Sequence, residues 1–396
     1  MKKPDKFLNR VRGMFRRFGS AFADGDPRDS FFYPGEEVTG LRDRPSAGFR
    51  NVIERSLYVW REDPLARRIV SLTTQFSVGR GFRVSADDPQ SDHLIRSFWE
   101  HPLNRMDARI PEWSDELCRT GNLFILLSSD ASGMSYVRAV PAGQIEEIIP
   151  RENDIEQPLF FRFREAAAPV FPARIPEERV LRAASLIEPD SGERMLHFTV
   201  NRPVGGQWGE PDLAPILPYL EYYRRWVDDR MRLNHYRNCF IYNVRKSRGS
   251  ESERLMRQSQ LNRLPPQPGT ILVTGVDEEW TVLQPNLDSA DANEDGFAVK
   301  KLIAAGAGIP VSFLAETAGT SKAENGGMED SACRNFRQRQ QMLLYLTETV
   351  LRHVLARAAL VRREIDPACE IHVYADDIAM PGMTEGGIIH DVREQP

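Results

Sequence analysis

The sequence lacks the signatures of several protein classes. Its four cysteines (Cys118, Cys239, Cys333 and Cys369) lie far apart, form no CxxC pair and have no histidine at zinc-ligand spacing. This usage indicates reduced thiols in a protein that folds in the cytosol. No apolar run reaches the roughly 18 to 20 residues of a membrane-spanning helix. The basic N-terminus is not followed by the apolar stretch of a secretory signal. The sequence therefore indicates neither a disulfide framework, nor a secreted chain, nor a membrane-spanning one.

Catalytic motifs are also scarce. We find no GxxxxGK[ST], HExxH or GxSxG and no usable Ser/His/Asp arrangement. Gly79-Arg80-Gly81 suggests a phosphate loop, but it follows a predicted helix and precedes a predicted strand, so a turn is expected. Tyr374-Ala375-Asp376-Asp377 matches the paired carboxylates of reverse-transcriptase-like enzymes, which need a third carboxylate to hold two metal ions. No upstream strand offers an obvious third carboxylate. We predict a non-enzyme without cofactor, metal ion or small-molecule substrate, and a polymerase-like enzyme remains the alternative.

What is present describes a globular protein of two to three domains. The chain has 396 residues, of which 41% are hydrophobic and 28% charged, with a net charge of -5 and a pI near 5.9. A protein that coats nucleic acid is normally basic. Any contact with DNA must therefore be local.

The first 48 residues are predicted to form a basic amphipathic arm followed by an extended segment. Within residues 1–18, apolar side chains recur at helical spacing and seven lysines and arginines fill the remaining surface. Such a helix suits a membrane surface or nucleic acid. It also suits docking on a neighbouring subunit, and the sequence leaves these alternatives open.

Residues 49–211 are predicted to form an α+β domain. A helical stretch begins at Phe49, continues through Pro64 and ends at Gly79. Short helices over 91–103 and 110–120 follow. Antiparallel strands then run from 122 to about 203, with a turn at Asp130-Ala131-Ser132-Gly133. His197 alternates within one of these strands and is interpreted as a structural rather than a catalytic histidine.

Two helical stretches dominate the rest of the chain. The first, Asp212–Phe240, has Asp212 as a candidate N-cap and Pro218 as either a kink or the true start. Its apolar stripe comprises Leu213, Leu217, Leu220, Tyr223, Val227 and Met231. At 1.5 Å per residue the intact helix spans about 40 Å, which suits a barrel of parallel copies better than a compact monomer.

A small α/β insertion follows, with too little apolar content for its own core, and we expect its strand edges to gain stability from neighbouring copies. The next helix covers Asn293–Gly308, and a small-residue stretch up to Gly327 predicts a mobile loop. A second long helix is expected over Met328–Arg363, followed by the strand EIHVYADDI.

The ordered series from Asn201 to Arg363 resembles the portal proteins of tailed bacteriophages. QWGEPDLAP leads into a long helix with Trp226, then come PPQPGTILV, the segment LQPNLDSADANEDGFAVKKLIAAGAGIPVSFLAE and the helix CRNFRQRQQMLL. GRGFRV and ELCRTGNLFILL resemble the N-terminal half of the same family. The likeness covers roughly residues 50 to 365, and its weight lies in the order of the segments rather than in any one motif.

The resemblance implies an α+β portal fold in a ring-forming subunit, usually of twelve copies. It divides the chain into a wing (49–211), a stem helix (212–240), a clip (241–288), a return stem helix (289–308), a tunnel loop (309–327) and the long wing helix with a small or absent crown (328–396). It further implies a virion protein assembled in the host cytoplasm. Its partners would be double-stranded DNA, the terminase large subunit, a head-tail adaptor, and the major capsid and scaffold proteins.

Two sets of candidate site residues follow from this assignment. The expected channel residues are Lys300, Lys301, Thr320, Ser321, Lys322 and Asn325, and the expected clip contacts to motor, adaptor or DNA are Arg245, Lys246 and Arg248. Tight phosphate binding would stall translocation, so a few lysines per copy in an acidic subunit suit a channel that DNA passes through. The alternative for both sets is an ordinary solvated or intersubunit surface.

Overall fold

The computed structural model describes residues 46–164, 180–238, 241–246, 250–263, 278–283, 292–314 and 322–378. Its helices are α2 (Ser46–Glu62), α3 (Pro64–Val78), α4 (Pro89–Glu100), α5 (Met106–Thr120), α6 (Leu217–Asn238), α7 (Glu251–Arg263), α8 (Ala292–Gly306) and α9 (Lys322–Ala359). Its strands are β1 (Phe82–Ala86), β2 (Asn122–Ser129), β3 (Ser135–Val140), β4 (Ile145–Arg151), β5 (Asp154–Phe163), β6 (Val180–Arg182), β7 (Arg194–Thr199), β8 (Ile241–Lys246), β9 (Glu278–Leu283) and β10 (Ile371–Ala375). The α+β class is confirmed.

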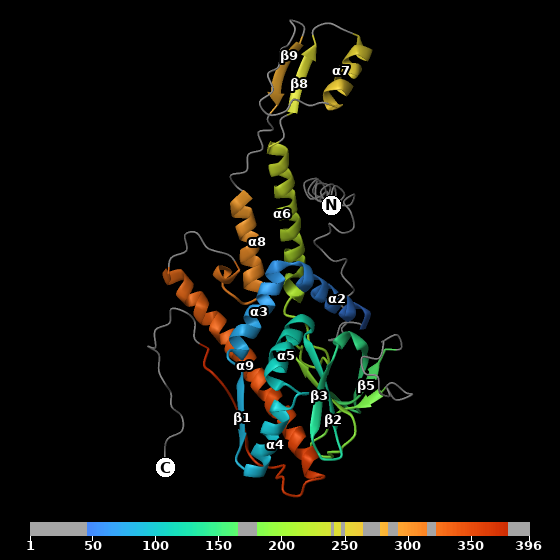
Figure 1. Ribbon diagram of the computed structural model, residues 1–396, viewed down its shortest axis with the longest axis vertical. Coiled ribbons are helices and arrows are strands. Elements are labelled where there is room, and N and C mark those ends of the chain that lie inside the picture. The colour runs from blue at the N-terminus through green and yellow to red at the C-terminus, as the bar shows by residue number, and fades with distance from the viewer. Residues whose placement is uncertain are drawn as a thin grey trace, which may run out of the picture.

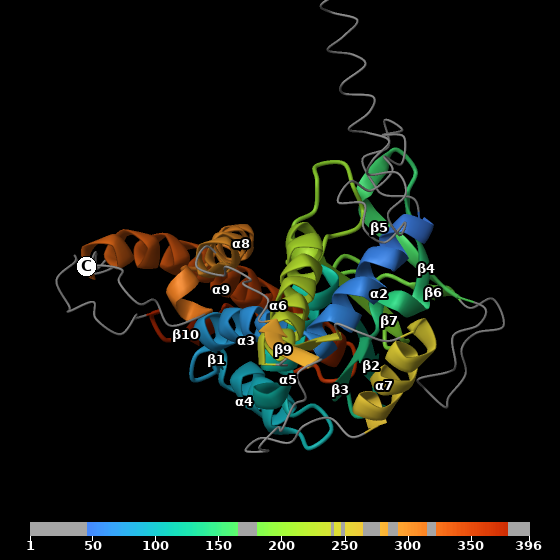
Figure 2. The same cartoon turned by 90° about the horizontal axis from the view of Figure 1, so that it is seen from above.

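The chain is arranged in three tiers along its longest axis (Figure 1). We call the lower tier, which holds α2 to β7 together with α9 and β10, the wing body. The helices α6 and α8 rise from it side by side and form the stem. Seen from above, α8 lies on the side of α6 towards which α9 extends (Figure 2). The strands β8 and β9 with α7 form the clip beyond the far end of the stem (Figure 1).

Two three-stranded antiparallel sheets organise the wing body, with strand orders β3-β2-β7 and β4-β5-β6. Strand β2 is buried on both faces: Phe124 and Leu126 enter one hydrophobic cluster, while Leu123, Ile125 and Leu127 enter another. Because successive side chains of a strand point to opposite faces, one strand supplies two cores. The predicted hairpin turn is confirmed: β2 pairs with β3 on either side of residues 130–133.

The predicted helical stretch after Phe49 is two helices. The chain breaks at Asp63, whose carboxylate accepts hydrogen bonds from the backbone N–H groups of Leu65 (2.8 Å) and Ala66 (3.1 Å) and so caps α3. Pro64 takes the first position of α3, where its missing N–H costs nothing. Burial raises the pKa of the Asp63 carboxyl, and the two backbone donors oppose that rise.

Helix α9 corrects the predicted boundary of the tunnel loop. It begins at Lys322, six residues before Met328, and so includes Gly326 and Gly327. Each glycine inside a helix costs about 1 kcal/mol relative to alanine, but α9 runs for 38 residues and its packed C-terminal half supports the whole rod. In that half Leu346, Val350 and Leu351 are fully buried against the sheet and α4.

The stem helix begins at Leu217, after a single 3-10 turn over Ala214–Ile216. Pro218 therefore lies in the first turn of α6, as one of the two predicted alternatives required. The prediction that Asp212 caps this helix is wrong. Its carboxylate instead binds Arg339 of α9 and the side-chain amide of Asn201.

Candidate functional site

The apolar stripe of the stem is buried at its base and bare further out. Leu213, Leu217 and Leu220 are at most 2% exposed and belong to one cluster with the end of α8 and the start of α9. Between residues 221 and 234 no side chain is buried, and Met231 is 65% exposed. The stripe therefore anchors the helix to the wing body over its first turn only, and its outer part is open to contact with other chains.

The two stem helices meet at a close contact between Trp226 and Gly296. A Cβ added at Gly296 would lie 2.4 Å from the indole ring of Trp226, so only glycine fits there. Trp226 in turn stacks on Tyr223, with ring centroids 5.7 Å apart. This contact sets α8 against α6 and decides which of the two lysines on α8 faces solvent.

Lys300 and Lys301 have different surroundings. The Nζ of Lys300 lies 5.3 Å from the centroid of the Tyr223 ring, so this half-buried lysine packs against α6. Lys301 is exposed, and its Nζ lies 4.7 Å from the ring of Phe297 on its own helix. Of the two predicted channel lysines, Lys301 is the one on the open face.

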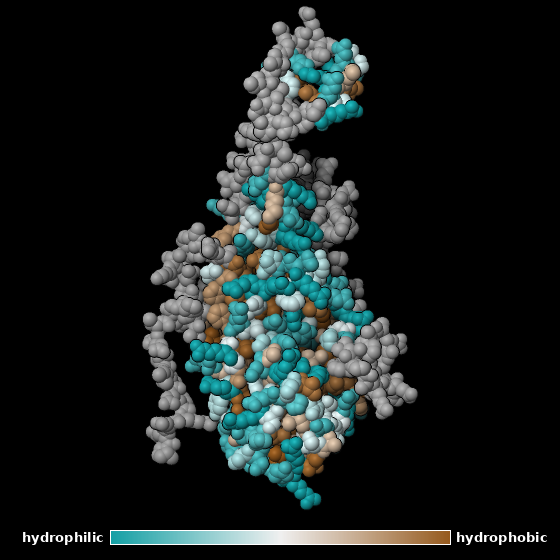
Figure 3. Space-filling model, in the orientation of Figure 1, coloured by the Kyte–Doolittle hydropathy of each residue, from teal (hydrophilic) through white to brown (hydrophobic). Residues whose placement is uncertain are grey.

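The open face of α8 is otherwise small and apolar. It carries Ala298, Lys301, Leu302 and Ala305, of which Leu302 is 54% exposed. Figure 3 shows hydrophobic colour gathered on the side of the molecule where α8 lies. A face with a single cation among small side chains presents little for a phosphate backbone to grip.

The remaining channel candidates are divided by the helix boundary. Lys322 and Asn325 lie in the first turns of α9 rather than in a loop, and for residues 322–330 only the backbone is described. Thr320 and Ser321 lie outside the described residues. The structure thus brings none of these four side chains into a defined arrangement with Lys301.

A polar joint, which the sequence did not reveal, ties the wing helix to the base of the stem. Nη2 of Arg339 on α9 donates to both carboxylate oxygens of Asp212 at 2.7 and 2.8 Å, and the two side chains are only 14% and 20% exposed. Asn335, one turn earlier on α9, donates to the carbonyl of Gly308 at 3.0 Å. These contacts line a groove of about 620 Å³ between α8 and α9. The sequence signal was an arginine within the otherwise apolar stretch of a long helix.

In the clip, the basic candidates stand opposite acids. The register of β8 and β9 pairs Arg245 with Glu279 and Lys246 with Glu278. Glu278 also accepts two hydrogen bonds from Arg257 of α7, at 3.0 and 3.1 Å. Oppositely charged cross-strand pairs stabilise a sheet. Arg245 and Lys246 thus have a structural explanation within one chain, and Arg248 lies outside the described residues.

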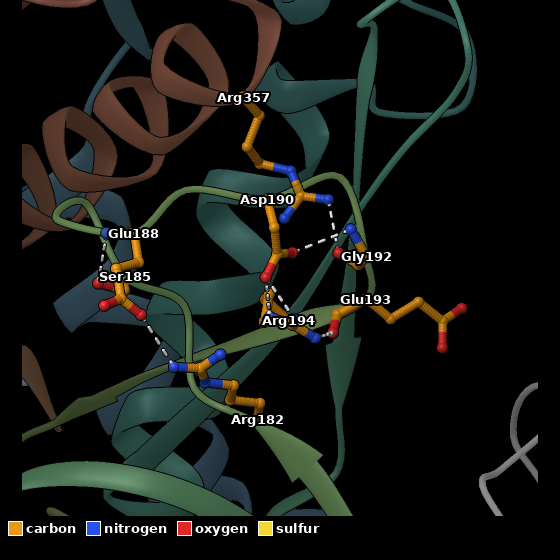
Figure 4. Close-up of polar contacts among 8 residues, drawn as sticks. All are labelled: Arg182, Ser185, Glu188, Asp190, Gly192, Glu193, Arg194 and Arg357. Atoms are coloured by element: carbon orange, nitrogen blue, oxygen red, sulfur yellow. Dashed lines mark hydrogen bonds and ion pairs between the residues drawn. The ribbon is translucent and has the colours of Figure 1, made fainter. Parts of the chain in front are cut away.

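On the wing body, the loop between β6 and β7 is held by a network of polar contacts (Figure 4). Arg357 of α9 is 3% exposed and donates to the hydroxyl of Ser129 (2.7 Å) and to the carbonyl of Gly192 (2.6 Å). Asp190 accepts from the Gly192 N–H at 2.9 Å and binds Arg194. The tip of this loop carries Ile187, which is 88% exposed.

The YADD segment has no metal-binding geometry. It ends β10, which among the described strands pairs only with β1, in a two-stranded ribbon. Asp376 forms an ion pair with Arg83 at 3.1 Å. Within the described ranges, no three His, Cys, Asp or Glu side chains converge so as to hold a metal ion. Gly79 and Gly81 both have positive φ in the connection from α3 to β1, so the predicted turn is confirmed.

His197 is a structural histidine in β7, as predicted. Its ring stacks on Phe124 at 4.2 Å, and its Nε2 lies 3.1 Å from the side-chain oxygen of Asn122. Complete burial lowers the pKa of His197 to about 3, and nearby Arg202 adds to the effect. The imidazole is therefore neutral at physiological pH.

The alternative of a membrane scaffold rests on residues 1–18, which lie outside the described part of the chain. None of the helices that the structure describes is both long and apolar enough to cross a membrane.

Comparison with solved structures extends over most of the chain. A chain in the virion of a native gene transfer agent particle matches with a TM-score of 0.54 and 11% identity, over 84% of this chain and 84% of that one. The chain shares its fold with a subunit of that particle. A chain in the neck of the native particle, computed with C12 symmetry, gives a TM-score of 0.52 and 11% identity over 81% of this chain and 83% of that one.

A portal protein of the HK97 phage family from Corynebacterium diphtheriae gives a TM-score of 0.40 and 13% identity, over 81% of this chain and 94% of that one. That TM-score lies below the value at which a shared fold follows. No protein-family model and no curated protein matches the sequence.

Proposed function

We propose that this chain is a portal subunit: copies of it form a ring at one capsid vertex, and double-stranded DNA passes through the ring during packaging and ejection. The observation that carries the proposal is the fold shared over 84% of the chain with a subunit of the gene transfer agent virion. The match to a neck chain computed with C12 symmetry supports a ring of twelve copies.

The stem supports the same function. Its outer half buries no side chain in a single copy, although it carries Met231 and exposed charges such as Arg232. Side-by-side stems around an axis would cover these surfaces and leave the face of α8 with Lys301 as a candidate lining of the channel. The clip, at the far end, is then the docking site for the terminase motor and the head-tail adaptor.

Electron microscopy of the purified chain tests this proposal. We expect end-on views of a ring with a central hole, and native mass spectrometry should give a mass near twelve copies. A single-copy particle at all concentrations, with and without capsid partners, would contradict it.

The polymerase-like alternative has no observation in its favour, because Asp376 is engaged by Arg83 on a two-stranded ribbon. Metal-dependent nucleotide incorporation by the purified chain would revive that alternative.

A further inference from the structure

Helix α7 is the least covered helix of the part of the chain that the structure describes. None of its residues is buried, yet it carries Leu255 and Met256, which are 61% and 66% exposed. A helix of 13 residues is marginal in water without packing partners. The two strands beside it, β8 and β9, form a sheet of only two strands, which is also marginal alone.

The contacts inside the clip are mainly electrostatic. Arg257 joins α7 to Glu278 of β9, and the cross-strand pairs join basic residues of β8 to acidic residues of β9. Exposed ion pairs contribute only about 0 to 1 kcal/mol each. These contacts orient the clip, but they do not bury the apolar side chains of α7.

The direction of these side chains follows from helical geometry. Arg257 marks the side of α7 that faces β9. Leu255 lies two residues away, a rotation of about 200°, and so points away from β9. The strand β8 lies between α7 and β9 (Figure 1), so the bare side of α7 and the far side of β9 are opposite flanks of the clip.

Ring symmetry selects the partner, on the basis of the proposed function. A rotation about an axis along the stem keeps every residue at its own height. The clip lies beyond the ends of both stem helices (Figure 1), so the clip of the next copy is what stands beside it. A ring contact joins one flank of a subunit to the opposite flank of its neighbour.

We infer that Leu255 and Met256 of each α7 pack against the β9 flank of the neighbouring copy's clip. On that flank Glu279 and Thr281 are exposed, and the register places the Ile241–Leu283 pair in the same alternating row. The clip is thus completed only in the ring, as alternating helix and sheet around the axis. The surface left for motor and adaptor is its outer end.

Cysteine pairing between two single variants tests this contact directly. Full-length Leu255→Cys and Thr281→Cys chains, mixed before assembly and oxidised, should form a disulfide-linked dimer that can only join two copies. Gln258→Cys, on the flank of α7 opposite Met256, is the matched control and should give much less dimer with Thr281→Cys. Three native cysteines are buried, and a wild-type mixture measures the background from Cys239.

Assembly gives the second readout. Leu255→Asp should raise the subunit concentration needed for ring formation by at least about tenfold, as expected for loss of an apolar interface anchor. Its monomer should keep the wild-type melting temperature, and Gln258→Asp should assemble normally.

The outcomes separate this contact from the ring itself. Normal rings from Leu255→Asp, together with no disulfide-linked dimer from the two cysteine variants, would overturn this inference and leave the ring intact. Loss of motor or adaptor binding in such rings would assign α7 to that partner instead. Absence of rings in the wild type would contradict the proposed function.

Discussion

The wing body and the protrusion of stem and clip follow opposite rules within one chain. In the wing body, strand β2 feeds two hydrophobic clusters, and even a cation such as Arg357 is buried with hydrogen-bond partners. In the protrusion, α7 buries nothing, and α6 buries nothing between residues 221 and 234. The comparison teaches that the wing body is stable by itself, whereas the protrusion is built to be completed by other copies.

The largest expected effect separates the two ends of one apolar stripe. Leu220→Asp would place a carboxylate in a site with no exposure, at a cost above about 4 kcal/mol, and the chain should fail to fold. Met231→Asp, on the exposed half of the same helix, should give a folded monomer. Circular dichroism and thermal melting measure both. Normal melting of Leu220→Asp would mean that the base of the stem is not part of the core.

The joint between wing body and stem comes next. Arg339→Met should cost about 3 kcal/mol, because it leaves the largely buried carboxylate of Asp212 without its partner. The double variant Arg339→Met/Asp212→Asn should cost less than the sum of the two single changes, and urea denaturation measures the difference. Additive costs would show that the two side chains do not act as a pair.

Acid should weaken the wing body through His197. Its folded pKa is about 3 and its unfolded pKa about 6.5, so its contribution is complete above pH 6.5 and falls as the pH drops towards 3. At pH 5 the loss is about 2 kcal/mol from this residue. Burial also lowers the pKa of His353, to about 4, so that histidine acts in the same direction.

The variant His197→Phe isolates this contribution, since each protein is compared with itself at pH 7 and pH 5. The pH-dependent loss should shrink by about 2 kcal/mol in the variant. An unchanged loss would place the acid sensitivity elsewhere.

The smallest effect on stability is expected at the open face of the stem. Lys301→Glu should change the free energy of unfolding by less than about 0.5 kcal/mol, because the side chain is exposed. DNA passage through the ring should nevertheless change with salt concentration. Lys300→Glu is the comparison: it loses the contact with Tyr223, worth about 0.5 to 1 kcal/mol. Equal stability losses at both positions would contradict their different placement.

The sequence predicted best where local chemistry and packing agree. The α+β class, the hairpin at 130–133, the turn around Gly79 and the structural role of His197 all rest on local signals, and all are confirmed. Predictions failed where distant residues decide. Asp212 has the chemistry of an N-cap, but Arg339, which lies 127 positions further along, binds its carboxylate. Gly326 and Gly327 favour a loop locally, but they continue a helix whose packed half begins later.

The candidate site was harder to predict than the fold. No local pattern distinguishes Lys300 from Lys301, because the difference arises from the approach of Trp226 to Gly296. The acids opposite Arg245 and Lys246 depend on a strand register across more than 30 positions. The roles of Lys322, Asn325 and the clip residues stay predictions.

The two glycines that join the stem connector to the central sheet have a mechanical consequence. A Cβ at Gly209 would lie 2.2 Å from the carbonyl oxygen of Gly121, and Gly121 has a positive φ of 74°, so the two main chains touch directly. Val200 closes the contact with a hydrogen bond to the carbonyl of Gly121 at 2.9 Å. With no side chain between them to change rotamer, tension along α6 is passed to the sheet as if through a welded seam.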